Sequence, residues 1–295
     1  MSYETWWRSI SLVCAEELQT ECVSREMEAA SQLKPVSRGF RIRAVALPVE
    51  HGGWSLLLEP IVVGLLLAPT ISGLFVSLAA TGAFLARHPF KLAVRDWRRK
   101  LHSPRTVMSE RFAILYAFIA IFGLAFAINT GGTAFLFPFL LATPSVILQL
   151  FYDATGRSRA LVPELAGSIS TAAVATAIAI SGGWPSPAAY GLWVILAARA
   201  TPTILYVRAR IQQLHDKQAS PSAVIFVHVL AVLVVIALAM AQLAPYAAVL
   251  AMFILLVRAS VGFSKSDRQV TARKIGMREV VFGAMTIFLV TIGYA

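Results

Sequence analysis

Nine apolar stretches, separated by short polar or turn-forming segments, dominate the chain. A helix that crosses the hydrocarbon layer needs about 20 mainly apolar residues, with about 17 as the lower limit. Glycine and proline mark the tight turns between several of these stretches. The pattern predicts an all-α, polytopic transmembrane helix bundle. Its expected spans are about 53–69, 71–87, 112–129, 132–152, 164–182, 187–207, 221–241, 243–259 and 279–294.

The first 43 residues have a different character. They hold a polar run of mixed charge and then a basic patch of Arg38, Arg41 and Arg43. No apolar stretch follows a basic start, so we do not expect a signal peptide. We predict two parts: a cytoplasmic N-terminal segment, 1–43, that is amphipathic or partly disordered, and a transmembrane helical domain, 44–295.

The composition supports a membrane protein and excludes several other classes. Hydrophobic residues make up 58% of the chain and charged residues 14%, against roughly 45–50% and 25% in soluble domains. A soluble enzyme, a secreted disulfide scaffold and a disordered protein are therefore excluded. The two cysteines, Cys14 and Cys22, lack CxxC spacing, so we expect neither a disulfide framework nor a metal site. The sequence identifies no cofactor.

The positions of the basic residues predict how the chain is oriented in the membrane. The net charge is +11, and the Lys and Arg residues fall in the N-terminal segment and in the stretches 87–111, 157–159, 199–217 and 258–278. By the positive-inside rule the N-terminus and these stretches face the cytoplasm, in the cell (inner) membrane. We expect no nucleic-acid partner. Outgoing helices are expected to begin near carboxylates, which favour a helix N-terminus, namely Glu50, Glu110, Glu164, Asp216 and Glu279.

The most distinctive string, PVEHGGW at 48–54, opens the first span. His51, Ser55 and Glu59 follow at i, i+4 and i+8, which places them on one helical face. A carboxylate inside a span indicates a site with a partner, or a hydrogen-bonded structural group. We expect Glu50, His51 and Glu59 to orient a ligand or to act as acid–base groups.

A second polar face lies along the sixth span and continues beyond its end. It carries Arg199, Thr203, Tyr206, Arg210 and Gln213 at helical spacing. A cation as deep as Arg199 requires an anionic ligand or a carboxylate such as Glu59. The end of the fourth span offers a smaller polar pair at i and i+4, Gln149 and Asp153.

The 87–111 stretch is the most basic part of the chain. Arginine and lysine side chains from Arg87 to Arg98 share one face of a continued helix, and Phe90, Trp97 and Leu101 lie on another. This pattern is typical of an interfacial helix that contacts phospholipid headgroups. Binding of a phosphorylated substrate by the arginines is the alternative.

Three strings together resemble the YwiC-like integral membrane proteins. They are the PxEHGxW entry to the first span, the Arg87-His88-Pro89 string and a Glu-led helix after a basic loop. The resemblance covers about residues 48–294. It implies an integral membrane protein and carries no defined molecular activity.

The predicted topology also resembles that of the UbiA prenyltransferases, which have nine helices and a cytoplasmic active-site mouth. Their paired aspartates hold magnesium, whereas the corresponding loops here have one aspartate each, Asp96 and Asp216. The resemblance implies a cavity for an anionic isoprenoid- or phospholipid-like ligand, and it leaves open whether the protein only binds this ligand or is a divergent prenyltransferase. Arginines would replace magnesium electrostatically. The expected ligand-binding residues are Arg95, Asp96, Gln149, Asp153, Arg199, Tyr206, Arg208 and Arg210.

Two other functions remain open. Charges and prolines inside spans are also typical of a transporter of small anions. A non-catalytic scaffold or assembly factor would use residues 1–43 to recruit a partner. Membrane lipids are the expected partners, and the sequence identifies no protein partner.

Overall fold

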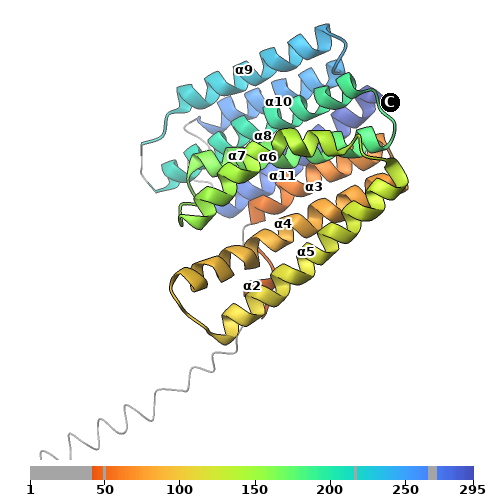
Figure 1. Ribbon diagram of the computed structural model, residues 1–295. Helices are drawn as coiled ribbons and strands as arrows, with labels where there is room; N and C mark the ends of the chain where they lie inside the picture. The colour runs from red at the N-terminus through yellow and green to blue at the C-terminus, as the bar shows by residue number, and fades with distance from the viewer. Residues whose placement is uncertain (1–41, 49–50, 216–217, 265–270) are drawn as a thin grey trace, which may run out of the picture. The chain divides into compact units, whose positions relative to one another are not determined.

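The computed structural model describes residues 42–295, apart from 49–50, 216–217 and 265–270. Over these ranges the chain forms ten helices and no strand (Figure 1). Nearly all of the expected N-terminal segment, 1–43, lies outside the described residues. So do Glu50, Asp216 and the side chain of His51.

Nine of the described helices, α3 to α11, correspond one for one to the nine predicted spans. Seven are long and apolar enough to cross a membrane, and two shorter apolar helices, α3 and α10, complete the set. The predicted all-α fold and multi-pass membrane character are confirmed. The helices are α3 (His51–Leu67), α4 (Ile71–Arg98), α5 (Pro104–Gly131), α6 (Leu136–Ala154), α7 (Leu161–Ser181), α8 (Ser186–Leu214), α9 (Pro221–Met240), α10 (Tyr246–Gly262) and α11 (Ala272–Tyr294), preceded by the short α2 (Ile42–Ala46).

Several helices continue beyond their apolar stretches, because backbone hydrogen bonding does not stop where hydrophobicity does. Helix α4 runs to Arg98, and α5 begins at Pro104, well before the predicted span. Ser103 caps α5 by accepting a hydrogen bond from the Thr106 backbone at 3.3 Å. The expectation that helices begin near Glu110 and Glu279 is therefore wrong. Glu164 does lie in the first turn of α7.

Small residues allow the helices to pack closely. A Cβ atom at Gly82 of α4 would lie 2.7 Å from the backbone nitrogen of Ala120 in α5, and one at Gly123 would lie equally close to Ala79. Helix α7 occupies the centre, with 67% of its spanning window buried against 17% for α5 and α6. Its interior side chains are mostly alanine, serine and threonine, which is typical of packing between membrane helices.

The two ends of the bundle differ in chemistry. Helices α4, α6, α8 and α10 finish at one end, where α5, α7, α9 and α11 begin. We call this the basic end, because the Lys and Arg side chains of the described helices gather on its side. The turns at the other end, 68–70, 132–135, 182–185 and 241–245, hold no charged residue.

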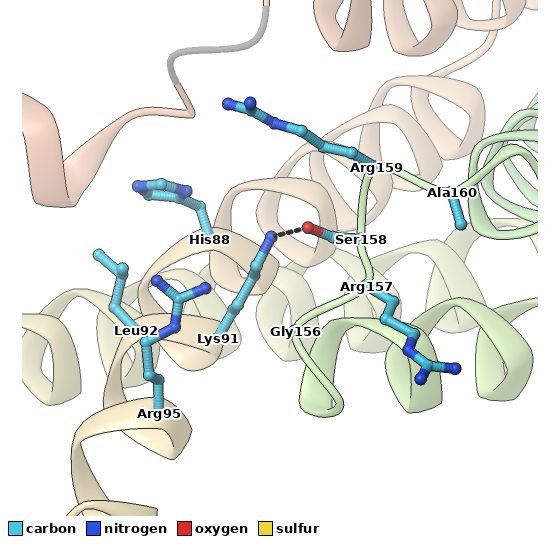
Figure 2. Close-up of a pocket in the computed structure, with 9 residues that line it drawn as sticks. All are labelled: His88, Lys91, Leu92, Arg95, Gly156, Arg157, Ser158, Arg159 and Ala160. Carbon is cyan, nitrogen blue, oxygen red and sulfur yellow. Dashed lines mark hydrogen bonds between the residues drawn. The ribbon is translucent and has the colours of Figure 1, made fainter.

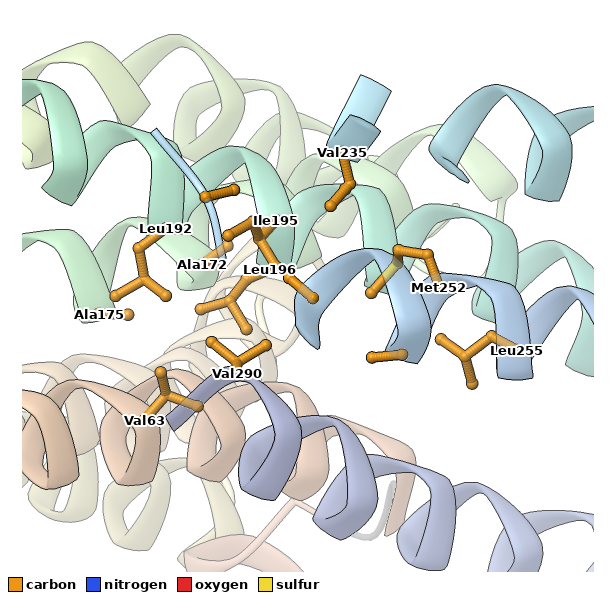
Figure 3. Packing of buried hydrophobic residues seen from close by; sticks show 13 residues of the cluster. Val63, Ala172, Ala175, Leu192, Ile195, Leu196, Val235, Met252, Leu255 and Val290 are labelled. Carbon is orange, nitrogen blue, oxygen red and sulfur yellow. The ribbon is translucent and has the colours of Figure 1, made fainter. Parts of the chain in front are cut away.

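The largest cluster of buried apolar residues in the described part of the chain joins α3 to the helices α7 to α11 (Figure 3). Val63 of α3, Leu196 of α8, Leu255 of α10 and Val290 of α11 are at most 4% exposed. Each lies closer to the uncharged end than the charged residues of its own helix. On these four helices, the apolar core therefore lies toward the uncharged end and the charged residues lie toward the basic end.

Candidate functional site

A pocket of about 700 Å³ lies at the basic end, between the last turns of α4 and the α6–α7 loop. We call it the basic pocket. Figure 2 shows that α4 contributes one wall and residues 156–160 the other. The pocket is lined by His88, Lys91, Leu92, Arg95, Gly156, Arg157, Ser158, Arg159 and Ala160, and none of these carries a carboxylate.

The end of α6 fixes the cations of α4. Arg87 donates to both carboxylate oxygens of Asp153, with Nε–Oδ2 at 2.6 Å and Nη2–Oδ1 at 3.1 Å. Lys91 Nζ lies 3.6 Å from the same carboxylate and donates to Ser158 Oγ at 2.6 Å (Figure 2). Asp153, an expected ligand contact, thus positions Lys91 beside the pocket.

Two further contacts hold the end of α6 and the α6–α7 loop, one from α4 and one from α8. Arg98 of α4 donates to the carbonyl oxygen of Ala154 at 2.5 Å. Arg208 of α8 donates through Nη1 to the carbonyl oxygen of Arg159 at 3.0 Å and to Glu164 at 2.8 Å. Arg208, which we expected to contact the ligand, instead fixes the loop that forms one wall of the pocket.

Arg95 and Arg159 face solvent at the pocket. Among the described residues, neither guanidinium group forms an ion pair or a side-chain hydrogen bond, unlike Arg87 and Arg208. The same part of the chain holds no group of three His, Cys, Asp or Glu side chains that could bind a metal ion. The lining of the pocket itself carries positive charge, on Lys91, Arg95, Arg157 and Arg159.

Two other expected ligand contacts make contacts within the protein. Asp96 is buried and accepts a hydrogen bond from Thr106 Oγ1 at 3.1 Å, which joins the end of α4 to the start of α5. Gln149 donates to the carbonyl oxygen of Pro163 at 3.4 Å and lies against Gly167 of α7. Neither side chain lines the basic pocket.

A second polar site lies inside the bundle. Arg199 of α8 pairs with Glu59 of α3, with Nη1 and Oε2 2.6 Å apart and side-chain exposures of 3% and 10%. The sequence named this carboxylate as one possible partner of Arg199, and the contact is confirmed. Gly283 of α11 leaves room for the pair, because a Cβ atom there would lie 2.5 Å from Glu59 Oε1.

A second buried ion pair joins α10 to α11. Arg258 contacts Glu279, and its guanidinium group lies 4.1 Å from the ring centroid of Tyr206. Arg258 Nη2 also lies 3.5 Å from Thr203 Oγ1. Tyr206, another expected ligand residue, is thus covered by a protein cation.

The two buried ion pairs are neighbours. Thr203 follows Arg199 by one turn of α8, and Glu279 precedes Gly283 by one turn of α11. The pairs therefore lie roughly 6 Å apart along the helices. We call Glu59, Arg199, Arg258 and Glu279 the charge cluster. Sequence reasoning missed its second pair, because Arg258 and Glu279 resembled charges at helix ends.

The remaining motif residues have structural contacts. Arg210, an expected ligand residue, is buried and donates to Gln213 at 3.0 Å. Trp54 of the PVEHGGW string packs edge-on against Phe84 of α4, at 5.6 Å between centroids. A Cβ atom at Gly53 would lie 3.3 Å from the same ring, so a small residue fits there.

Comparison with known proteins gives one match. No curated protein and no solved structure matches the chain. The topological resemblance to UbiA prenyltransferases is therefore not confirmed. A family model described as YwiC-like protein matches residues 47–179. This segment contains every residue that lines the basic pocket, and Glu59 of the charge cluster. Over residues 47–179, from α3 into the last turn of α7, the chain is thus matched by the YwiC-like family that its sequence predicted.

Proposed function

We propose that this membrane protein binds an anionic, phosphate-bearing, lipid-like ligand in the basic pocket. The observation that carries the proposal is the lining of the pocket. Lys91, Arg95, Arg157 and Arg159 are among the residues that line a volume of about 700 Å³, and no lining residue is acidic. Arginine suits such a ligand because its planar fork of donors matches the oxygens of a phosphate.

The depth of the pocket supports a lipid rather than a soluble ligand. Lys91 lies 20 residues after the start of α4, about 30 Å along the helix axis. The hydrocarbon layer is also about 30 Å thick, so the pocket lies at the level of lipid phosphate groups. The Lys and Arg distribution supports a cytoplasmic orientation of this end.

The size and location of the pocket also support a role in ligand binding. Ligand pockets usually have volumes of about 300–1,000 Å³, and this pocket falls within that range. Its lining residues all belong to the segment that matches the YwiC-like family, whereas Arg199, Arg208 and Arg210 lie outside it. The pocket is therefore a better candidate for a function shared with that family than the polar face of α8.

An isoprenoid diphosphate is one form that this ligand could take, in a divergent prenyltransferase. Lys91 and Arg95 would then stabilise the charge that develops on the departing diphosphate. Glu50 and His51, at the entry to α3, are the proposed acid–base groups. Glu59 forms an ion pair with Arg199. It could act as an acid–base group only if that ion pair opened.

Native mass spectrometry of the gently extracted protein tests the proposal. We expect a co-purifying anionic lipid that is lost when Arg95 and Arg159 are both replaced by glutamine. Arg273→Gln is the matched control, because Arg273 is an exposed arginine of α11, a helix that packs on α3, α8 and α10. Equal lipid retention by all three proteins would refute the proposal.

Transport of a small anion is a second candidate, and the observation in its favour is the charge cluster. Two arginines inside a membrane bundle are rare and are often functional. Each is already paired with a carboxylate, and the apolar core lies between the cluster and the uncharged end. Uptake of phosphate or sulfate into proteoliposomes, reduced by Arg199→Gln, would favour this candidate over the first.

A further inference from the structure

The basic pocket carries more positive charge than a common phospholipid headgroup can neutralise. Arg87 and Lys91 share the single carboxylate of Asp153, so this group keeps one net positive charge. Arg95 and Arg159 have no carboxylate partner among the described residues and add one charge each. The pocket therefore presents about three uncompensated positive charges, and a phosphodiester headgroup carries only about one negative charge.

Arg157 is left out of this count. Figure 2 shows its side chain turning away from His88, Lys91 and Arg95. His88 is also left out, because its Nε2 donates to the carbonyl oxygen of Ala44 at 3.2 Å and the neutral ring suffices for that bond. The three remaining charges come from both walls of the pocket, α4 and the α6–α7 loop.

The arrangement of these cations also favours a multiply charged ligand. Lys91 is fixed by Ser158 at 2.6 Å and by Asp153 at 3.6 Å. The Arg159 backbone is fixed by Arg208 at 3.0 Å. Lys91 is thus held before binding and loses less conformational entropy when a ligand contacts it, whereas the exposed side chains of Arg95 and Arg159 become ordered only through contacts with the ligand. A phosphate group with several terminal oxygens makes more such contacts than a diester, which has two.

We propose that the basic pocket selects a headgroup with more than one negative charge, a phosphomonoester or a diphosphate, over a singly charged phosphodiester. A phosphomonoester carries about 1.5 to 2 negative charges near neutral pH. This inference rests on the proposed function and names the chemical class of its ligand.

Lipid titration by native mass spectrometry tests the selection. The purified full chain would be titrated with phosphatidic acid, phosphatidylglycerol and phosphatidylcholine of identical acyl chains. We expect phosphatidic acid to bind about tenfold more tightly than phosphatidylglycerol, the factor that one further charge-assisted hydrogen bond supplies. Arg95→Gln and Arg159→Gln should each remove most of this difference, and Arg273→Gln should keep it.

Other outcomes separate this inference from the proposed function. Equal binding of the two anionic lipids, weakened by Arg95→Gln, would overturn the selection and leave an anionic lipid site in place. Binding that neither pocket substitution changes would overturn both. Inorganic pyrophosphate is the soluble probe. If it binds at the pocket arginines as tightly as phosphatidic acid, the preference for multiple charges stands and the lipid nature of the ligand is refuted.

Discussion

Replacing Glu59 by glutamine should strongly destabilise the protein. The substitution keeps the shape of the side chain and removes its charge, which leaves Arg199 buried at 3% exposure without its 2.6 Å partner. Removing one member of a buried ion pair typically costs about 3–5 kcal/mol, because the other charge stays desolvated and unpaired. We expect a loss of that size in the free energy of unfolding.

The chain provides a matched control for this prediction. Arg208 and Glu164 form an ion pair of the same residue types at 2.8 Å, but their side chains are 35% and 36% exposed. An exposed pair contributes about 0–1 kcal/mol, so Glu164→Gln should change the free energy of unfolding by no more than that. Tryptophan fluorescence during thermal unfolding in detergent would compare the two variants.

The double variant Glu59→Gln, Arg199→Gln separates a lost charge pair from a simple packing defect. With no unpaired charge left, the double variant should be more stable than the sum of the two single effects predicts. Coupled neighbours usually show an interaction free energy of about 0.5–3 kcal/mol. The reasoning is refuted if Glu59→Gln costs no more than Glu164→Gln, or if the two single effects simply add.

Two further substitutions test other contacts. Gly283→Ala should lower the free energy of unfolding by about 1–3 kcal/mol through overpacking, because the new Cβ atom would lie 2.5 Å from Glu59 Oε1. Gly276→Ala is the control, because a Cβ atom there meets nothing within 4 Å. Equal unfolding midpoints for the two variants would contradict this prediction. Asp153→Asn weakens a bidentate pair and should cost about 1.5–3 kcal/mol. Asp153→Asn should also leave Lys91 less fixed, so phosphatidic acid should dissociate faster in a lipid-release assay. Unchanged stability together with unchanged lipid release would exclude both effects.

Much of the fold could be predicted from the sequence because the bilayer restricts what a chain can do. A long apolar stretch is expected to be helical, because a helix pairs its own backbone groups and unpaired backbone groups are not tolerated in hydrocarbon. The ends of the helices could not be predicted in this way. Hydropathy marks where side chains meet water, while α4, α5 and α11 continue into the polar layer by their own hydrogen bonds.

The candidate sites were only partly predictable. A carboxylate and a cation at similar depth, Glu59 and Arg199, had to find partners, and their pairing could be named from sequence. The pairing of Arg258 with Glu279 was not predicted, because a charge near the edge of an apolar stretch resembles a charge at a helix end. Their burial depends on how α10 and α11 lie against α8, which one sequence does not reveal.

The basic pocket shows the same limit. Arg95 was expected at a ligand site, but Lys91 was assigned to an interfacial helix and the 157–159 stretch served only to predict orientation. They join Arg95 only because Asp153 and Ser158 bring the end of α6 against α4. Contacts between segments more than 60 residues apart are set by tertiary packing and leave no local signal in the sequence.

Photo-crosslinking is the most direct test of the central claim that the basic pocket holds an anionic lipid. A photoactivatable phosphatidic acid, with its reactive group next to the phosphate, would be reconstituted with the full chain, and the labelled peptides would be mapped. The account predicts label concentrated in residues 88–95 and 156–160, reduced by Arg95→Gln and unchanged by Arg273→Gln. Label spread evenly over the lipid-facing surfaces of α5, α6 and α9, with no enrichment at the pocket, would contradict it.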